Sequence, residues 1–277
     1  MYKIAQLLRP PGVHVPILRF FAIGYSPSDK IENNLNSYVP QDSIPPKVVS
    51  FDCAQTLLEV DWSVKRYIAD VCAVAGLQIP LEAPAIYEQL HRERLGEYLA
   101  ANLTRNHDVC DAWWIQLGSD WLRVVGLDPD WAPRLQELSD RIGFGPESIL
   151  FTLYDDVVPT LDLLAELGIR MAVLSNWDYT LHKSLRGAGI YDRFELVVAS
   201  LEHGVEKPDP RLFQVLIDHF NVAPEEILHI GDNPLDDLEG AIVSGMRGAL
   251  IDRSRTNTHE PWLHDLRCLE EAFGWIG

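Results

Sequence analysis

The strongest constraint on the fold is an alternation that begins near residue 150, where short apolar runs take turns with amphipathic segments of helical period. Strands are expected at 47–51, 169–175, 194–200, 226–232 and 248–253, and helices at 156–167, 177–187, 209–220 and 234–245. Near-continuous apolar strands are typical of a parallel sheet that helices cover on both faces. The chain is therefore expected to form a three-layer α/β fold.

Residues 60–150 differ from the rest, because they contain helical periods and few strand candidates. We expect a mostly helical cap domain here, inserted into a core that consists of 46–59 and 151–277. Three tryptophans fall in one amphipathic segment of this cap, namely Trp113, Trp114 and Trp121. Packing inside the small helical domain is favoured for them over contact with a substrate.

Residues 1–45 are rich in Pro, Asn and Ser and show no sustained period, so we expect a poorly ordered N-terminal extension. Their apolar stretch is interrupted by Arg19 and is too short to span a bilayer. A peripheral membrane anchor is the alternative.

Composition narrows the choice of partners. The formal net charge of −18 argues against nucleic acid or an anionic membrane, since both attract basic surfaces. A phosphorylated small molecule stays compatible, because a bound divalent cation reverses the local field. The four cysteines are scattered, so reduced thiols in a cytoplasmic protein are expected. The oligomeric state stays open.

Polar side chains gather where the predicted strands end. They are Asp52 and Thr56 after the first strand, Ser175 and Asn176 after the second, Asp232, Asp236 and Asp237 after the fourth, and Lys207 before the helix at 209–220. Each of them alone is typical of a turn or a helix cap. Ligands of open parallel sheets, however, bind beyond the carboxyl ends of the strands. The set together therefore predicts a site at that edge.

The expected chemistry of this edge is phosphoryl transfer. Asp52 and Asp232 end strands that should be neighbours, and two carboxylates ~4 Å apart repel by ~4 kcal/mol at an effective dielectric constant of 20. Mg²⁺ suits such a pair, since it is held by one or two carboxylates together with substrate phosphate. Ser175 and Asn176 are placed to donate hydrogen bonds to phosphate oxygens, and Lys207 supplies positive charge.

Four ordered segments resemble the motifs of the haloacid dehalogenase superfamily of hydrolases: "VVSFDCAQTLL", "MAVLSN", "VEKPDP" and "HIGDNPLDD". They span the core from about 46 to 252, and their order fits the capped form, in which a helical cap follows the first motif. The resemblance implies a Rossmann-like core.

The resemblance also implies roles for single residues. Asp52 would be the nucleophile that forms an aspartyl-phosphate, with Thr56, Ser175 and Lys207 as further catalytic residues. Ser175, Asn176 and Lys207 would contact the substrate. The implied Mg²⁺ ligands are the Asp52 side chain, the Ala54 carbonyl, Asp232 and one acid of the pair Asp236 and Asp237, of which the register with "LEGA" favours Asp237.

Ala54 departs from the superfamily's phosphatases, in which an aspartate at this position protonates the leaving group and then activates water. Such help is worth about 10²–10⁴ in rate, and alanine cannot supply it. Gln55 replaces a glycine that is frequent before the threonine, which leaves the loop conformation open. We expect a Mg²⁺-dependent phosphatase of a small phosphorylated molecule, faster on aryl or acyl phosphates than on alkyl phosphates.

Other functions remain open. Ala54 and Gln55 also motivate a non-catalytic phospholigand-binding or regulatory protein that keeps the fold and the metal site. Phosphonate cleavage is less favoured, because it requires a Schiff-base lysine in the cap, and Lys65, the one lysine of 60–150, is expected to face solvent. A dehalogenase is also less favoured, because dehalogenases typically lack the acidic "GDNPLDD" motif. The substrate is not identified.

The histidines suggest no site of their own. His107 and Cys110 have a spacing compatible with zinc, but no second pair accompanies them, so coincidence is favoured. His182, His203 and His229 have no partner that the sequence identifies.

Overall fold

A six-stranded sheet forms the core of the molecule in the computed structural model, which describes residues 45–61, 63–254 and 262–269. Every pairing in it is parallel, in the order β5-β4-β1-β6-β7-β8. The strands are β1 (Val48–Phe51), β4 (Arg170–Ser175), β5 (Leu196–Ala199), β6 (Ile227–Gly231), β7 (Arg247–Ile251) and β8 (Trp262–Leu263). The predicted parallel α/β sheet is confirmed, and β8 was not predicted. The expected extension at 1–45 lies, except for its last residue, outside the described residues.

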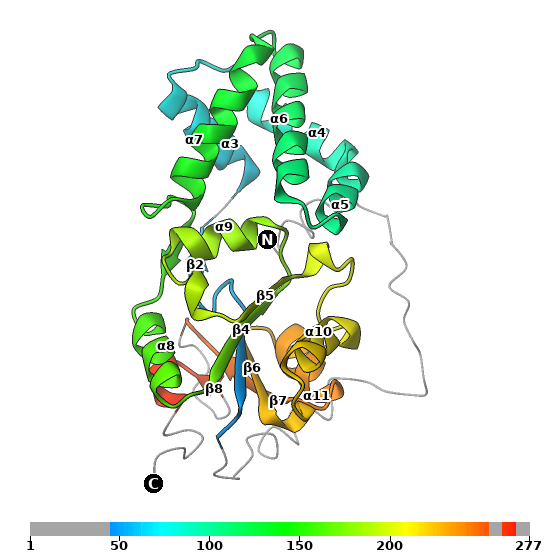
Figure 1. The fold of residues 1–277 in the computed structure, drawn as a ribbon. Coiled ribbons are helices and arrows are strands. Elements are labelled where there is room, and N and C mark those ends of the chain that lie inside the picture. The colour runs from blue at the N-terminus through cyan, green and yellow to red at the C-terminus, as the bar shows by residue number, and fades with distance from the viewer. Residues whose placement is uncertain (1–44, 62, 255–261, 270–277) are drawn as a thin grey trace.

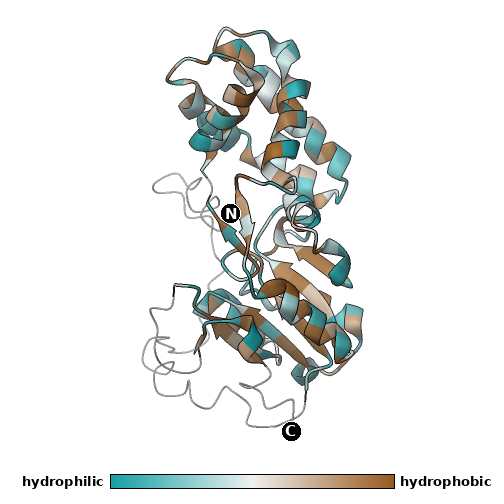
Figure 2. Ribbon diagram, turned by 90° about the vertical axis from the view of Figure 1, so that its left-hand side faces the viewer, coloured by the Kyte–Doolittle hydropathy of each residue, from teal (hydrophilic) through white to brown (hydrophobic). Residues whose placement is uncertain are grey.

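Helices cover both faces of this sheet (Figure 1). They are α8 (Val157–Glu166), α9 (Thr180–Gly187), α10 (Pro210–Phe220), the π-helical turn η6 (Pro234–Glu239) and α11 (Gly240–Val243). Alternate residues of β1 serve the two faces: Val49 packs in a cluster with α8 and α9, and Val48 packs with α10 and α11. Figure 2 shows the core strands in hydrophobic brown, as burial on both faces requires.

Local signals fix the ends of these helices. Asp209 caps α10 by accepting from the Arg211 backbone N–H, and Pro210 occupies the first turn. Asn221 ends α10 in a left-handed conformation with φ 51°. Among the described helices, none combines the length and the apolar character that a membrane crossing requires.

The segment between β1 and α8 carries a second body of helices above the sheet (Figure 1). Its helices are α3 (Val64–Ala75), α4 (Ala83–Glu93), α5 (Leu95–Leu103), α6 (His107–Val124) and α7 (Ala132–Phe144). Arg94 lies between α4 and α5 and ends the first of these helices. A two-stranded antiparallel ribbon of β2 (Leu58–Val60) and β3 (Phe151–Leu153) joins this cap to the core.

The three cap tryptophans have different environments. Trp113 and Trp121 are buried in the packing of the cap, and the Trp121 Nε1 donates to the Ala83 carbonyl over 2.8 Å. Trp114 is half-buried and lines a pocket. Packing therefore accounts for two of the three, and the third faces open space.

The loop after β1 holds Gln55 in the left-handed region, at φ 59°. This region costs a side chain with a Cβ about 1–2 kcal/mol. Local contacts hold the residue there: its backbone N–H donates to Leu58 O over 2.7 Å, and its side-chain oxygen accepts from Tyr154 over 2.9 Å. Gln55 thus reproduces the backbone conformation that glycine adopts easily.

We expect Gln55→Val to lower the free energy of unfolding by about 1–2 kcal/mol relative to Gln55→Asn, because a β-branched residue resists positive φ and asparagine tolerates it. Both variants shorten the side chain and remove its hydrogen bond with Tyr154. Urea titration followed by circular dichroism measures the difference. Equal stability of the two variants would contradict the strained loop.

Candidate active site

The carboxyl edge of the sheet brings the predicted site residues together. Asp52 follows β1, Ser175 ends β4, and Asp232 follows β6. Since β1 lies between β4 and β6 in the sheet, the three side chains start from adjacent strands. The Ser175 hydroxyl donates to Asp52 Oδ1 over 2.9 Å, and both residues are buried.

Lys207 reaches this edge from the loop before α10. Its Nζ donates to Asp52 Oδ1 over 2.7 Å, to Asp237 Oδ1 over 2.5 Å and to the Leu174 carbonyl over 2.8 Å. All three protons of the ammonium group are used, and the residue is buried. This lysine therefore fixes the separation of two carboxylates, one directly after β1 and the other in η6.

Asn176 holds the backbone of Lys207. Its side-chain oxygen accepts from the Lys207 N–H over 2.7 Å, and its Nδ2 donates to the Lys207 carbonyl over 3.0 Å. The amide thus fixes the loop that carries the lysine.

Thr56 lies in the loop after β1 and is fully buried. Its carbonyl accepts a hydrogen bond from Arg253 Nε over 3.2 Å, while its hydroxyl has no hydrogen-bond partner within the described residues. Ala54 lies between Asp52 and Thr56, half-buried, with a methyl group where an acid would be useful.

Of the two acids in "LDD", Asp237 joins the site. Its Oδ1 accepts from Lys207, and its Oδ2 accepts from the Asn233 backbone N–H over 2.9 Å. Asp236 instead accepts from the Asn233 side chain over 3.1 Å. A Cβ on Gly231 would lie 2.1 Å from the Asp237 Cγ, so glycine is required for the carboxylate to approach the strand.

His229, which has no partner recognisable in the sequence, lies beneath the site on β6. Its Nε2 is 3.1 Å from Asp237 Oδ1, and its Nδ1 is 2.6 Å from the Ser50 hydroxyl on β1. Burial lowers the pKa of this imidazole. His229 thus supports Asp237 from inside the sheet, and no local sequence signal distinguishes it from a core histidine.

Burial and neighbouring charges raise the pKa of Asp52 and Asp232 and lower the pKa of Asp237. Burial raises the pKa of Asp52, against the lowering effect of Lys207. Burial, together with Asp52 and Asp237, raises the pKa of Asp232 to about 7. For Asp237, burial is outweighed by Lys207 and His229, so its pKa lies below the ordinary value.

These acids form a plausible cation site by their chemistry. One oxygen each from Asp52, Asp232 and Asp237 lies within 4.8 Å of the others. Three carboxylates face one ammonium group, so a divalent ion would balance the remaining charge. Oxygen donors in this number suit Mg²⁺, which prefers carboxylates.

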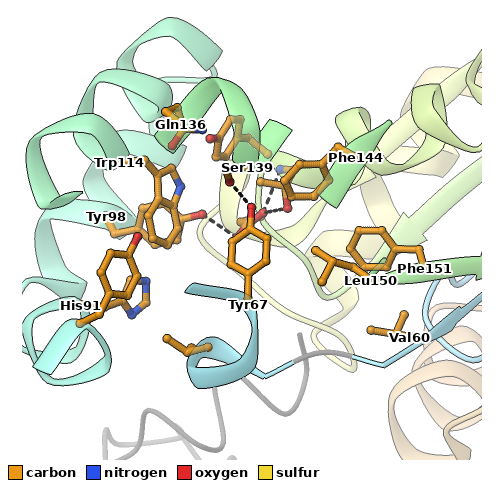
Figure 3. A pocket seen from close by; sticks show the side chains of 15 residues that line it. Val60, Tyr67, His91, Tyr98, Trp114, Gln136, Ser139, Phe144, Leu150 and Phe151 are labelled. Atoms are coloured by element: carbon orange, nitrogen blue, oxygen red, sulfur yellow. Dashed lines mark hydrogen bonds between the residues drawn. The ribbon is translucent and has the colours of Figure 1, made fainter. Parts of the chain in front are cut away.

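A pocket lies between the cap and the loop that follows Ser175. It encloses about 800 Å³ of empty space, part of which is open to solvent. Figure 3 shows aromatic side chains around it, among them Tyr67, Tyr98, Trp114, Phe144 and Phe151. From the core, Asp178 and Thr180 complete the lining. The pocket is therefore mainly apolar and opens beside the second motif.

Asp178 was not among the site residues predicted from the sequence. Its Oδ2 accepts from the Tyr98 hydroxyl of the cap over 2.5 Å, and burial raises its pKa. The next residue continues the same contact between cap and core, because the Tyr179 N–H donates to Asn102 over 2.9 Å. In the sequence, the only indication for Asp178 was its position three residues after Ser175.

Lys65 lies away from this pocket. Its side chain is 62% exposed, and its Nζ lies 3.7 Å from Glu88 on α4. The exposure expected from the sequence agrees with this position.

In protein stripped of metal, we expect the free energy of unfolding to fall more steeply in the parent than in Asp232→Asn as pH rises from about 4 to about 7. The folded pKa of Asp232 lies near 7 against an ordinary 3.8, so the folded state binds more protons than the unfolded chain within this window. The loss is at most ~1.4 kcal/mol per pH unit. Asp52 shifts in the same direction, and Asp237 acts oppositely only below about pH 4. The lowered pKa values of His229 and His91 oppose the fall below about pH 6.5, so the contribution of Asp232 is the difference in slope between the parent and Asp232→Asn.

Urea unfolding with a chelator at pH 5 and pH 7.5 measures this slope. Asp232→Asn is the control and should flatten it. Added Mg²⁺ should stabilise the protein more at pH 7.5 than at pH 5. A slope that is unchanged in Asp232→Asn would contradict the assignment.

Comparison with known proteins now identifies the family. Residues 46–245 match the family model of the haloacid dehalogenase-like hydrolases. The chain is 29% identical over 234 residues to haloacid dehalogenase-like hydrolase domain-containing protein 3 of Danio rerio, covering 82% of this chain and 95% of the relative. It is 31% identical to glyceraldehyde 3-phosphate phosphatase of Methanopyrus kandleri, over 78% of this chain and 88% of the relative.

Solved structures with a similar fold include a member of the same superfamily. A 2-haloacid dehalogenase from Pseudomonas syringae superposes with a TM-score of 0.59 at 23% identity, over 83% of this chain and 100% of the other. The parallel sheet with its Rossmann-like order, the four motifs and the family match agree. The chain belongs to the haloacid dehalogenase-like hydrolases.

Proposed function

We propose that this hydrolase is a Mg²⁺-dependent phosphatase of a small phosphorylated molecule, with Asp52 as the nucleophile. The proposal rests on the arrangement around Asp52, whose Oδ1 accepts from both Ser175 and Lys207. Two donors on one oxygen hold the carboxylate in a single orientation. In the described part of the chain, this leaves Oδ2 as the oxygen directed at a substrate.

The reaction has two steps. Asp52 Oδ2 attacks phosphorus, the bond from phosphorus to the leaving oxygen breaks, and an aspartyl-phosphate forms. Water then attacks that phosphorus and releases phosphate, which regenerates the Asp52 carboxylate. Ser175 and Lys207 keep the nucleophile aligned and offer hydrogen bonds to phosphoryl oxygens.

Mg²⁺ would be held by Asp52, Asp232 and Asp237 with the backbone carbonyl of Ala54, and it would neutralise negative charge on the phosphoryl group. A carbonyl needs no particular side chain, so alanine at position 54 retains this ligand. Asp237 also pairs with Lys207 and His229, and these contacts keep its carboxylate ionised.

We infer that the preferred substrates have leaving groups that depart without a proton. Ala54 carries no acid, so the leaving oxygen departs as an anion or takes its proton from water. Aryl phosphates meet this need, and the aromatic pocket beside Asp178 offers stacking surfaces for an aryl group. The phosphatase relative supports the reaction type, while its substrate is a property of that protein.

A non-catalytic phospholigand-binding protein is the second candidate, and Ala54 is the observation that favours it. Loss of the general acid would slow turnover by about 10²–10⁴ without affecting the residues that hold phosphate. The two candidates differ in whether activated phosphates are hydrolysed.

For the enzyme, we expect the rate on substituted phenyl phosphates to rise steeply as the pKa of the leaving phenol falls, because no group donates a proton to it. Steady-state kinetics over a phenol series with Mg²⁺ measures this slope. Asp52→Asn should remove the activity at every leaving group. A flat series, or activity that survives Asp52→Asn, would exclude the proposed mechanism; Mg²⁺ binding without any turnover would favour the second candidate.

We expect Ala54→Asp to raise the rate on alkyl phosphates by about 10²-fold or more and to flatten the dependence on leaving-group pKa. Ala54→Asn is the matched control, because asparagine has nearly the same size as aspartate and cannot transfer a proton. The measurement is kcat/KM on one alkyl and one aryl phosphate for each variant. Equal gains in both variants would mean that packing, and not proton transfer, is responsible.

A further inference from the structure

A second cluster of metal-binding side chains lies where the cap meets the core, outside the active site. It consists of His107 at the start of α6, His182 on α9 and Glu202 in the short helix η4 (Ser200–Glu202). One ligating atom from each lies within 4.8 Å of the others. Residues 95 positions apart thus form one group.

The three side chains point their ligating atoms at one another. His107 Nε2 lies 3.1 Å from Glu202 Oε1, and His182 Nε2 lies 3.1 Å from Glu202 Oε2. Ligand atoms about 2.0–2.2 Å from a tetrahedral zinc ion stand about 3.3–3.6 Å apart. Both histidine–glutamate separations are a few tenths of an ångström shorter than this, so these two pairs need to move apart only slightly to admit an ion.

The surroundings suit a cation. Glu202 and His182 are buried, and the side chain of His107 is one-third exposed, which leaves a way in for an ion and a water ligand. Burial, followed by the carboxylates of Asp178, Asp111 and Glu202, raises the pKa of the Cys110 thiol to about 12. Cys110 lies one turn from His107, so these carboxylates, opposed in part by Lys183, lie near this end of the cluster. The second nitrogen of His182 faces the Tyr191 hydroxyl at 3.4 Å, as the outer nitrogen of a ligating histidine commonly does.

We propose that His107, His182 and Glu202 form a zinc site that fastens the cap to the core. Two imidazoles and one carboxylate are a ligand set that zinc uses with a fourth, water-occupied position. Mg²⁺ does not compete well, because it prefers oxygen ligands. The spacing of His107 and Cys110 is not the basis of this site; the second and third ligands come from the core.

The site adds to a contact that the chain already makes. Arg105, two residues before His107, donates through Nε to the Glu202 carbonyl over 3.0 Å and lies 3.0 Å from His203 Nδ1. The corner between α5 and α6 is thus held against η4 by the backbone as well as by the cluster. Zinc binding would make this attachment of the cap dependent on a metal ion.

The test measures metal binding and needs no substrate. Full-length protein without a histidine tag, carrying Asp232→Asn to weaken the carboxylate site, is stripped with a chelator and titrated with Zn²⁺ by calorimetry in excess Mg²⁺. We expect one Zn²⁺ per chain. Co²⁺ in its place should give the strong visible absorption of a tetrahedral site.

His107→Gln and His182→Gln should each weaken Zn²⁺ binding by at least about tenfold and remove the Co²⁺ absorption, because glutamine keeps a donor for Glu202 and loses the imidazole. His203→Gln is the matched control and should bind as the parent does. No binding in the parent, or binding unchanged in both ligand variants, would overturn the proposal and leave a hydrogen-bonded triad. Neither result bears on phosphatase activity.

Discussion

The buried ammonium group of Lys207 is the contact on which the active site depends. It joins Asp52, Asp237 and the Leu174 carbonyl, and thereby links strands β1, β4 and the turn after β6. Burial on its own lowers the pKa of Lys207, yet Asp237 and Asp52 raise it above the ordinary value, so the charge persists. Removing one partner from such a group leaves an uncompensated buried charge, which is strongly destabilising. The site and the stability of the sheet edge are therefore coupled.

The loop after β4 connects this charge network to the cap. Ser175 and Asn176 at its start hold Asp52 and the loop that carries Lys207, while Asp178 and Tyr179 bind Tyr98 and Asn102 of the cap. A single short segment thus serves the phosphate end of the site and the aromatic pocket. The loop therefore connects the contacts of Asp52 with the contacts of the cap.

Ala54 and the aromatic pocket are compatible with the same kind of leaving group. If Asp52 is the nucleophile, as proposed, a site without an acid at position 54 favours leaving groups that are stable as anions. Phenolic groups are stable in this sense, and their rings could stack on Tyr98 or Trp114. The backbone of the loop at 54–56 keeps its conformation through Gln55, which adopts positive φ. The alanine therefore changes proton transfer while the surrounding framework is preserved.

The sequence by itself determined the parallel sheet, its flanking helices and the acids at the strand ends, because apolar periodicity and turn chemistry are local properties. It also identified the family through four motifs. The register of the last motif favoured Asp237 over Asp236, but only the tertiary structure showed that the π-helical turn η6 brings Asp237 into contact with Lys207. The same holds for His229 beneath Asp237 and for Glu202 between two histidines. Such contacts arise when segments distant in sequence pack together, and no local pattern encodes which side chains will meet.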